Sequence, residues 1–369
     1  MEMQETKMVL ISGASFAGLT MAYWLNKRGY KITVVEIGTH LKMGGTPVDI
    51  KDKTVDIVRR MGLFEQIKAN RIGPSKWEFK NANDVSEHTV LLEKLPNNEF
   101  EIERDVLLNM FFDLVKDDVE FIFDNSIVSL CELENNIEVI FKDGSQYVYD
   151  LVFGCDGVHS TVRKIWFGEE KVYSHFLGQY FSIGIADRLL VEEGAYQMYA
   201  EPNKGVALYA YNNKTDIIFT FRPETEIEYD FRDPEQHKRI IVKQFAGASW
   251  RTAELLKEIL NSKSFYFDKF CQIKMPAWTK GRVALVGDAG YCASPAAGMG
   301  GSLAIIGATA LADAFEKYNG NFELAFEGYN RELRPFIESI QAGAVETLDK
   351  LLPRTEEEIR LRNKNGVNL

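Results

Sequence analysis

The chain contains 369 residues, of which 46% are apolar and 12% are aromatic. This length and composition suffice to bury one large core or two adjoining cores, which excludes a disordered protein. The formal net charge is −11, and no basic stripe with interleaved aromatic residues interrupts it, so nucleic acid is excluded as a partner. No apolar run approaches the roughly 20 residues that span a bilayer, and the short, polar, acidic start is unlike a secretion signal. We therefore expect a cytoplasmic protein without a membrane span, acting as a monomer.

The cysteine and histidine residues form no metal-binding pattern. The five histidines contain no HxxxH or HExxH motif, and the four cysteines lie far apart without a CxxC pair. We predict no metal site, so any redox chemistry requires an organic cofactor. Four residues are interpreted as small buried apolar side chains: Cys131, Cys155, Cys271 and Cys292.

The first 36 residues have the pattern of a βαβ unit. An apolar, β-branched run at 7–12 predicts a buried strand that ends at Gly13. The turn 13–18 leads into a predicted helix at 19–28. A second predicted strand, 31–35 (KITVV), ends at Glu36.

The glycines of the first turn have a mechanical role. Gly13 permits a tight turn and Gly18 lets the helix pack closely on the sheet, so a diphosphate can bind at the helix N-terminus. Glu36 follows Gly13 by 23 positions, where its carboxylate can accept hydrogen bonds from an adenosine ribose. Ser15 occupies the place of the middle glycine, which weakens the fingerprint. A glycine-rich turn without a dinucleotide is the alternative.

Short elements follow Glu36. A loop punctuated by glycine and proline is expected at 43–50 and a polar turn at 96–98. Arg104 stands directly before a predicted helix. Apolar residues between 121 and 141 mark strands that end at the turn 142–144. The predicted helices of this part cover 54–61 and 105–115.

Two further blocks join strands to polar turns. Residues 150–163 (DLVFGCDGVHSTVR) predict a strand that ends at Asp156-Gly157, then a helix capped by Ser160 and Thr161. Residues 281–301 (GRVALVGDAGYCASPAAGMGG) predict a buried strand that ends at Gly287-Asp288. A second glycine-rich turn and a helix over 300–317 complete this block.

These blocks resemble those of the class A flavoprotein monooxygenases, the para-hydroxybenzoate hydroxylase type. The turn at Gly13, the Asp-Gly block at Asp156, and the Gly-Asp block at Asp288 with Pro295 agree with that family in type, order and spacing. The segments SGASFAGLTMAYWL, MGGTPVDI and YNRELRPFIESIQ are similar to those of its tetracycline-inactivating subgroup. The resemblance implies an α/β fold with a Rossmann-like FAD-binding domain, an interleaved antiparallel-sheet substrate domain and a long C-terminal helix.

The resemblance also sets the expected domain boundaries. The chain has no internal repeat or low-complexity linker, so the two domains are expected to interleave. The FAD-binding domain is expected from 1–75, 99–173 and 268–320, and the substrate-binding domain from 76–98 and 174–267. Residues 321–369 form a C-terminal helical region, with a helix that is interrupted at Pro335 and an apolar stripe that includes Leu324.

Cofactor contacts are implied at positions that match the family. Arg104 would reach the phosphate or ribityl region of FAD, with a surface helix cap as the alternative, and Asp288 would bind ribityl or pyrophosphate oxygens. Asp156 would contribute to recognition of FAD and the nicotinamide cofactor, and capping of the next helix is compatible with that role. Lys42 stands where relatives often carry arginine. The other implied cofactor contacts are Gly13, Ser15, Ala17, Gly18, Glu36, Gly298, Met299, Gly300 and Gly301.

The middle region predicts a sheet that lines the substrate cavity. Runs at 176–187, 195–200, 205–212 and 216–222 predict antiparallel strands, and the charged, helical stretch 230–260 is expected to cover the outer face. Alternate side chains on one face would point into the cavity, and which face does so stays open. The expected substrate contacts are Met198, Tyr209, Tyr211, Ile218, Thr220, Pro295 and Ala296.

The resemblance implies the chemistry as well. NADPH or NADH would reduce FAD transiently, O2 would add at flavin C4a, and the hydroperoxide would hydroxylate an aromatic or polycyclic, for example tetracycline-like, substrate. The protein would bind FAD, exclude water and orient the substrate, so no catalytic residue is named. Gly44-Gly45 and Pro47 suit a loop that lets the flavin move outward. The alternatives are a reductase or halogenase on this fold, although the halogenase segment WxWxIP is absent, or a flavoprotein that sequesters a ligand without turnover.

Overall fold

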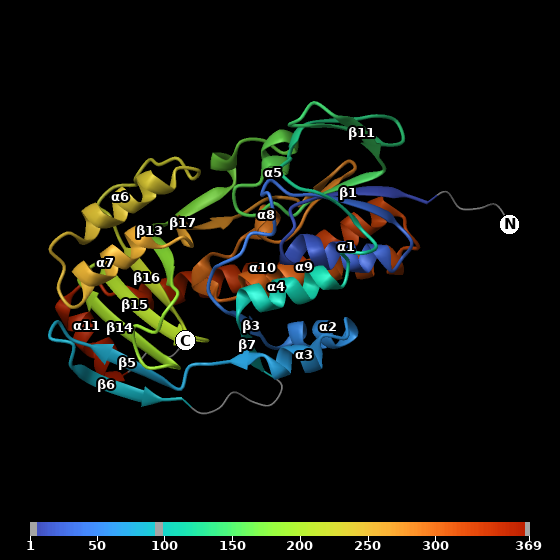
Figure 1. The fold of residues 1–369 in the computed structure, drawn as a ribbon. Coiled ribbons are helices and arrows are strands. Elements are labelled where there is room, and N and C mark those ends of the chain that lie inside the picture. Colours follow the sequence, from blue (N-terminus) through green and yellow to red (C-terminus); the bar gives the residue numbers. More distant parts are fainter. Residues whose placement is uncertain (1–5, 93–98, 366–369) are drawn as a thin grey trace.

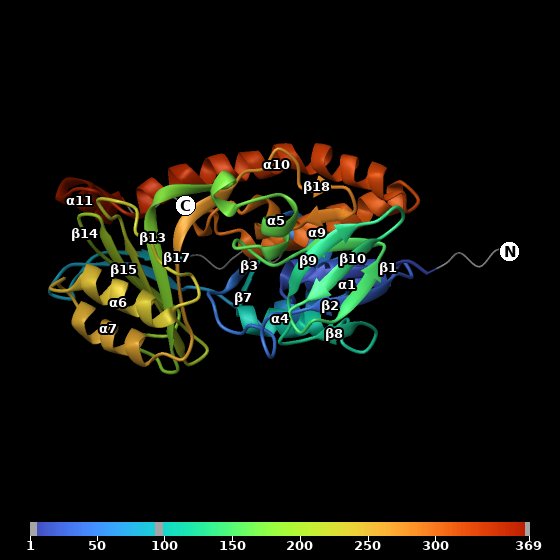
Figure 2. The ribbon, with the colours of Figure 1, turned by 90° about the horizontal axis from the view of Figure 1, so that it is seen from above.

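Two large sheets occupy the two ends of the molecule, and one 30-residue helix runs along both (Figures 1 and 2). The computed structural model describes residues 6–92 and 99–365. The polar turn expected at 96–98 therefore lies outside the described residues, as do 1–5, 93–95 and 366–369 of the expected domains.

The first sheet is a six-stranded, mainly parallel sheet. Parallel pairing joins β1 to β2 and β12, β2 to β8, and β12 to β19, while β18 is antiparallel. Parallel strands end at the same edge of a sheet, so the turns that follow β1, β12 and β19 lie along one edge. In spatial order the strands are β18 (Thr279–Lys280), β19 (Val283–Leu285), β12 (Leu151–Gly154), β1 (Met8–Ser12), β2 (Lys31–Val35) and β8 (Glu120–Ile122).

Helices α1 (Phe16–Asn26) and α9 (Gly300–Lys317) pack together beside this sheet (Figure 1). Ten consecutive residues of α1, 16–25, are buried, as expected for a helix that is covered on all sides. The Trp24 indole N–H donates to the Thr309 hydroxyl at 2.9 Å, which pairs the two helices inside the core. The helix predicted at 300–317 is confirmed with its bounds, and the helix predicted at 19–28 is confirmed with bounds of 16–26.

The second large sheet has seven strands, and the four predicted strands of the middle region form its centre. Neighbouring strands are antiparallel except β14 and β5, which are parallel, so the sheet is mixed where an antiparallel one was expected. Strand β17 spans the expected domain boundary at 268. The spatial order is β17 (Phe265–Ile273), β13 (Ser174–Ala186), β16 (Lys214–Phe221), β15 (Lys204–Tyr211), β14 (Ala195–Glu201), β5 (Lys76–Lys80) and β6 (Ser86–Leu91).

Helices α6 (Pro234–Phe245) and α7 (Thr252–Asn261) cover one face of this sheet (Figure 1). Asp233 begins α6 because its carboxylate accepts the Gln236 N–H, and Pro234 occupies the first turn. The predicted helical cover over 230–260 is confirmed. The helices bury Ile241, Phe245, Leu255 and Ile259 against strand residues that include Tyr180, Tyr199, Val206, Leu208, Ile217, Phe219, Phe221 and Phe267.

Helix α10 (Phe322–Leu351) is continuous, so the interruption predicted at Pro335 is wrong (Figure 2). Proline removes one backbone hydrogen bond, but Leu333 and Ile337 on either side of it are buried in the core and hold the helix in place. The predicted apolar stripe is wrong at Leu324, which is 46% exposed in the first turn. Asn321 caps this turn by accepting the Leu324 N–H.

The remaining elements are short. Cys131 on β9 (Ile127–Glu132) is exposed, against the expectation that all four cysteines are buried. Within 6–92 and 99–365, no helix is long and apolar enough to cross a membrane, and no group of His, Cys, Asp and Glu suits a metal ion.

The elements not yet given are β3 (Val48–Ile50), α2 (Lys53–Arg60), α3 (Phe64–Ala69), β4 (Arg71–Ile72), β7 (Phe100–Ile102), α4 (Arg104–Asp113), β10 (Ile137–Phe141), β11 (Gln146–Tyr149), α5 (Thr161–Trp166), the 3-10 helices η1 (Glu170–Val172) and η2 (Pro295–Ala297), α8 (Asp288–Tyr291) and α11 (Glu356–Asn365).

Candidate cofactor and substrate site

Three turns from distant parts of the chain meet at one edge of the six-stranded sheet. Gly13 has φ +105°, and a Cβ placed there would lie 2.4 Å from the Cys155 carbonyl oxygen. Gly287 has φ +69°, and its Cβ would lie 3.3 Å from the Cβ of Ala17. The turns after β1, β12 and β19 therefore pack directly against one another, and both glycines are needed for this approach.

The N-terminus of α1 has the form of an anion-binding turn. Gly18 lies so close to Gly13 that a Cβ would stand 1.9 Å from the Gly13 carbonyl oxygen. Ser15 precedes the helix, but its side chain caps no N–H of α1. The Ser15 hydroxyl instead accepts a hydrogen bond from Arg104 at 3.3 Å. The first amides of α1 are thus left without a side-chain cap, as an anion site at a helix N-terminus requires.

Glu36 closes over this turn from the end of β2. One carboxylate oxygen accepts the Ala14 N–H at 2.9 Å, and the other accepts the Gly38 N–H at 2.9 Å. These bonds hold the carboxylate beside the first turn, where a nucleotide ribose would be within reach. The ribose contact itself stays a prediction.

Arg104 joins the first turn to the loop that follows β2. Its guanidinium donates to the carbonyl oxygens of Lys42 (2.8 Å) and Gly44 (2.9 Å), in addition to Ser15. Burial lowers the pKa of Arg104, and the side chain is turned towards the turn, not towards solvent as a surface cap would be. Asp105 fixes the same loop by accepting the Gly44 N–H at 2.7 Å. A cation is therefore held beside the candidate diphosphate site.

Asp156 has the structural role that the sequence left open. Its carboxylate accepts the Ser160 hydroxyl at 2.5 Å and the Val162 N–H at 3.0 Å, so both oxygens serve the N-terminus of α5. Ser160 in turn accepts the Arg163 N–H. Burial raises the pKa of Asp156. A contact between Asp156 and a cofactor stays a prediction.

The turn before α9 presents open backbone. Gly298 and Gly300 are exposed, and no atom lies within 4 Å of a Cβ placed at either one. Met299 precedes α9 and makes no side-chain cap, so the first amides of this long helix are open to an anion or a carbonyl oxygen. Asp288 lies at the start of α8, and burial raises its pKa to about 6. Two uncapped helix ends, α1 and α9, together with the Arg104 guanidinium fit the diphosphate and ring of FAD.

The expected substrate residues of the sheet share one face. Direct strand pairs link Met198 to Ala207 and Ala207 to Ile218, and residues two apart on a strand point the same way. This face, which we call the inner face, is turned away from α6 and α7; it carries Met198, Tyr209, Tyr211, Ile218 and Thr220. Ala296 of η2 packs against Phe181 and Phe270 of the same sheet, while Pro295 is exposed. The inner face and the glycine-rich turn 295–301 therefore adjoin.

Two carboxyl groups that sequence reasoning missed bind tyrosines of the inner face. The Tyr209 hydroxyl donates to Glu101 at 2.7 Å, and the Tyr211 hydroxyl donates to Asp216 at 2.9 Å. Burial raises the pKa of both carboxyl groups to about 7. A signal for Asp216 was present, since it alternates with Ile218 along an apolar strand. Glu101 carried no signal, because it lies 108 positions from Tyr209.

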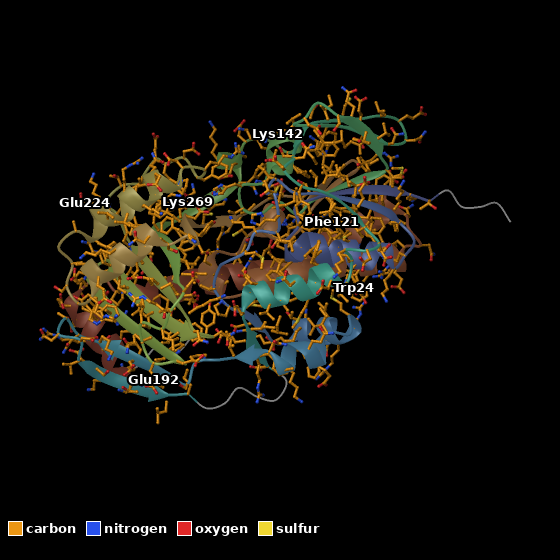
Figure 3. The ribbon with its side chains drawn as sticks, viewed as in Figure 1. Trp24, Phe121, Lys142, Glu192, Glu224 and Lys269 are labelled. Carbon is orange, nitrogen blue, oxygen red and sulfur yellow. The ribbon has the colours of Figure 1, made fainter. Side chains whose placement is uncertain are left out.

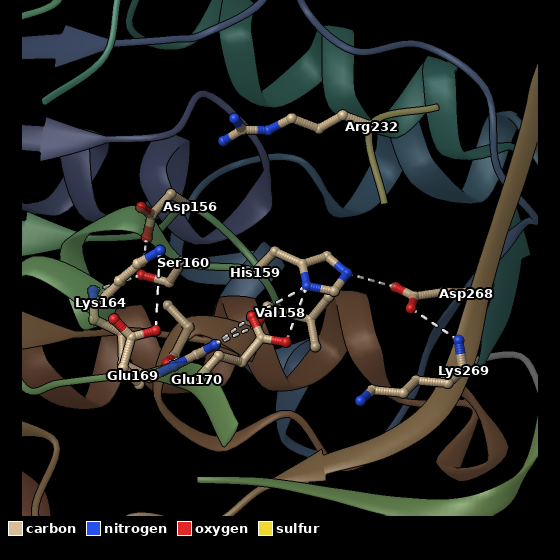
Figure 4. Close-up of polar contacts among 12 residues, drawn as sticks. Asp156, Val158, His159, Ser160, Lys164, Glu169, Glu170, Arg232, Asp268 and Lys269 are labelled. Carbon is tan, nitrogen blue, oxygen red and sulfur yellow. Dashed lines mark hydrogen bonds and ion pairs between the residues drawn. The ribbon is translucent and has the colours of Figure 1, made fainter. Parts of the chain in front are cut away.

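His159 links the turn after β12 to the second sheet (Figure 4). Its Nδ1 lies 3.1 Å from Glu170, and its Nε2 lies 3.1 Å from Asp268 of β17, the strand that Lys269 marks in Figure 3. Burial alone would lower the pKa of His159, but the hydrogen bonds to Asp268 and Glu170 outweigh burial and raise the pKa to about 9. His159 is thus an imidazolium held between two carboxylates. Sequence reasoning gave it no role.

The fold and the convergent glycine turns define a dinucleotide-binding flavoprotein. The chain belongs to the FAD binding domain family, whose profile matches residues 6–341. It is 33% identical over 352 residues to a flavin-dependent monooxygenase of Legionella longbeachae serogroup 1 (strain NSW150), covering 94% of this chain and 90% of the relative. The expected family, fold class and FAD-dependent monooxygenase class are confirmed.

Two solved structures are also similar over nearly the whole chain. The crystal structure of tetracycline destructase Tet(51) has a TM-score of 0.88 and 33% identity, covering 98% of this chain and 95% of that one. Tetracycline destructase Tet(55) has a TM-score of 0.85 and 32% identity, covering 97% and 94%.

Proposed function

We propose that this FAD-dependent monooxygenase consumes NADPH or NADH and O2 and hydroxylates an aromatic or polycyclic substrate. The observation that carries the proposal is the inner face of the second sheet, which places aromatic and apolar side chains opposite the open turn 295–301. Similarity to two tetracycline destructases supports tetracycline-like polycyclic phenols as the first candidates.

The turns of the first sheet bind the cofactor in this proposal. The uncapped amides of α1 and the Arg104 guanidinium hold the diphosphate, and Glu36 holds the adenosine ribose. Bound FAD supplies the redox chemistry, taking two electrons from the nicotinamide and activating O2 for transfer of one oxygen atom. The amides of Gly300 and Gly301 at the start of α9 would hold the ring of FAD, where their N–H groups would favour negative charge.

The inner face orients the substrate and limits access of water. Ile218 and Thr220 are half-buried, whereas their neighbours Ile217 and Phe219 are fully covered on the opposite side. Met198 and Ala207 are buried beside Phe79, and Leu351 at the end of α10 packs against them, so this part of the inner face is closed by the protein's own side chains. A planar, largely apolar ring system fits the half-buried part of this face, and exclusion of water there would favour oxygen transfer to the substrate.

The loop at Gly44-Gly45 is proposed to open for the nicotinamide cofactor. Both glycines have positive φ values, +87° and +103°, and Arg104 and Asp105 hold the loop through only a few hydrogen bonds. The sequence has no second βαβ glycine fingerprint, which supports transient docking without a separate nicotinamide domain.

The test uses purified protein loaded with FAD. Polycyclic phenols, tetracyclines among them, are screened for faster NADPH and NADH oxidation, and products made under 18O2 are analysed by mass spectrometry. We expect a substrate that accelerates oxidation and gains one labelled oxygen atom. Ligand binding without turnover would instead support a sequestering flavoprotein, and release of all reducing equivalents as hydrogen peroxide would contradict oxygen transfer.

A further inference from the structure

A row of four aromatic rings crosses one end of the inner face. Trp77, Tyr196, Tyr209 and Tyr211, here called the aromatic row, come from strands β5, β14 and β15. Successive ring centroids lie 5.7 Å, 5.7 Å and 5.0 Å apart. Trp77 pairs directly with Tyr196, and Tyr196 with Tyr209, so these rings share one side of the sheet. Tyr209 and Tyr211 are buried, at 4% and 3% exposed, and Trp77 and Tyr196 are half-buried, so the row forms an aromatic wall with its exposed surface on Trp77 and Tyr196.

Two carboxyl groups lie against this row without a cationic partner. Glu101 binds the Tyr209 hydroxyl, and Asp216 binds the Tyr211 hydroxyl. Asp216 has no exposed surface, and its second oxygen, Oδ2, meets no hydrogen-bond donor among the residues that the structure describes. Within residues 6–92 and 99–365, neither Glu101 nor Asp216 forms an ion pair with a lysine or arginine. A buried, unpaired carboxylate is costly, so this end of the inner face is suited to receive a positive charge.

The charged groups around the aromatic row carry a net negative charge. Four carboxyl groups gather here, on Asp49, Glu101, Glu103 and Asp216, and the described cations paired with them are the lysines Lys51 and Lys214. Lys51 stands 3.8 Å from Asp49, and Lys214 binds Glu103. Both lysines are thus paired with other carboxylates; the charge of Lys214 still acts on Asp216, but among the described residues neither lysine forms an ion pair with Glu101 or Asp216.

The cluster lies beside the candidate reaction site. Glu101 on β7 pairs with Asp49 on β3, and the Asp49 carbonyl oxygen accepts the Ser302 hydroxyl of α9 at 2.7 Å. Val48 of β3 lies against Gly301, where a Cβ would be 2.8 Å from its Cγ1. The aromatic row is therefore connected through two short strands to the helix end that is proposed to meet the flavin.

We propose that the aromatic row, with Glu101 and Asp216, is a subsite for an alkylammonium group on the substrate. This inference rests on the proposed function and narrows its substrate class to cationic aromatic or polycyclic compounds. Aromatic faces attract quaternary and tertiary ammonium groups, and the carboxylates supply the charge that balances them. An anionic ring substrate, such as a benzoate, is disfavoured at this end because it would meet like charge.

A pair of isosteric phenols tests the proposal. 3-Hydroxyphenyltrimethylammonium and 3-tert-butylphenol differ in one charge and have nearly the same shape. Their dissociation constants for the FAD-loaded protein are measured from changes in flavin absorbance. We expect the cation to bind at least about tenfold more tightly at pH 8, with a smaller preference at pH 6, where the carboxyl groups are protonated. Equal affinities, or absence of cation binding at millimolar concentrations, would overturn the proposal.

Conservative variants locate the preference. Asp216→Asn and Glu101→Gln should each reduce the cation preference several-fold while binding of 3-tert-butylphenol persists. Glu193→Gln, on an exposed loop of the same half, is the control. FAD content reports whether each variant is folded. If both variants keep the full preference, the subsite is wrong.

Turnover is measured separately, so the two proposals can fail independently. Cation preference without oxygen transfer to any phenol would refute the monooxygenase mechanism alone. Oxygen transfer to neutral phenols without cation preference would refute the subsite alone.

Discussion

The candidate site has two halves: the glycine turns of the six-stranded sheet, and the inner face of the seven-stranded sheet. Backbone atoms form the first half, and side chains form the second. In the turns after β1, β12 and β19, backbone meets backbone so closely that Gly13 and Gly18 have no room for a Cβ. On the seven-stranded sheet the site is formed by side chains, and alternation along each strand decides whether a residue faces α6 and α7 or the turn 295–301. A substitution in a turn should therefore affect cofactor binding directly. On a strand, a substitution on one face should affect stability, and a substitution of the next residue, on the other face, should affect substrate binding.

The largest effect is expected at Gly13. A valine there would place Cβ 2.4 Å from the Cys155 carbonyl oxygen at φ +105°, which forces the first turn away from the Asp-Gly turn. We expect Gly13→Val to weaken FAD binding more than about 100-fold, because the amides proposed to bind the diphosphate would lose their geometry. The ratio of flavin to protein absorbance after gel filtration measures this loss.

Gly29→Ala is the matched control for Gly13→Val. Gly29 also has positive φ, +79°, but a Cβ there meets no atom within 4 Å. It should cost only about 1 kcal/mol of stability and retain FAD. Stoichiometric flavin in folded Gly13→Val protein would show that the turn does not bind the cofactor.

The same contrast explains what the sequence could predict. The glycine turns follow strands within a few residues, so local spacing and hydrophobic pattern revealed the βαβ unit and the edge where the blocks meet. The inner face depends on which strands pair and in what register, and Glu101 and Asp268 lie more than a hundred positions from Tyr209 and His159. Such contacts leave no local pattern. At Pro335 the local pattern predicted a helix interruption that does not occur, because packing of the neighbouring residues outweighs the helix-breaking tendency of proline.

The next largest effect concerns His159, which joins the two halves of the molecule, and it is a dependence of stability on pH. His159 has a pKa of about 9 in the folded protein, above its ordinary value of 6.5. Its stabilising contribution is therefore complete below about pH 6.5 and is lost as the pH rises through 9. We expect the free energy of unfolding of the FAD-loaded protein to fall by on the order of 3 kcal/mol between pH 6.5 and 10 through this group.

Variants isolate the contribution of His159 from other groups that titrate in the same range. His159→Gln should flatten the pH dependence of urea unfolding by about the amount expected for the imidazolium. The control variant is His40→Gln, which replaces an exposed histidine whose ring contacts Thr39. A wild-type curve parallel to that of His159→Gln would mean that the imidazolium does not fasten the two halves together.

Arg104 tests whether side chains assist the backbone in the cofactor half. Arg104→Ala removes hydrogen bonds to Lys42, Gly44 and Ser15 and a cation beside the proposed diphosphate site. We expect FAD to bind about 30-fold more weakly, or about 2 kcal/mol. Arg104→Lys should be intermediate, since an ammonium cannot bridge the same acceptors. Flavin fluorescence titration of the apoprotein measures both, with the exposed Arg239→Ala as control. Unchanged affinity in Arg104→Ala would remove this residue from the cofactor site.

The smallest effect compares two adjacent residues on β16. Ile217 is fully buried under α6 and α7, whereas Ile218 is half-buried on the inner face. Ile217→Val should lower the free energy of unfolding by about 1 kcal/mol and leave substrate affinity unchanged, because it opens a gap in a packed core. Ile218→Val should cost only a few tenths of a kcal/mol, since its outer methyl is not enclosed, yet it should change the affinity for bulky phenols. Urea unfolding and phenol titration on both variants decide which face binds the substrate. If Ile217→Val changes the affinity for phenols and Ile218→Val does not, the substrate binds on the side of α6 and α7. If both variants lower the free energy of unfolding equally, the inner face is closed by packing and is not open to a ligand.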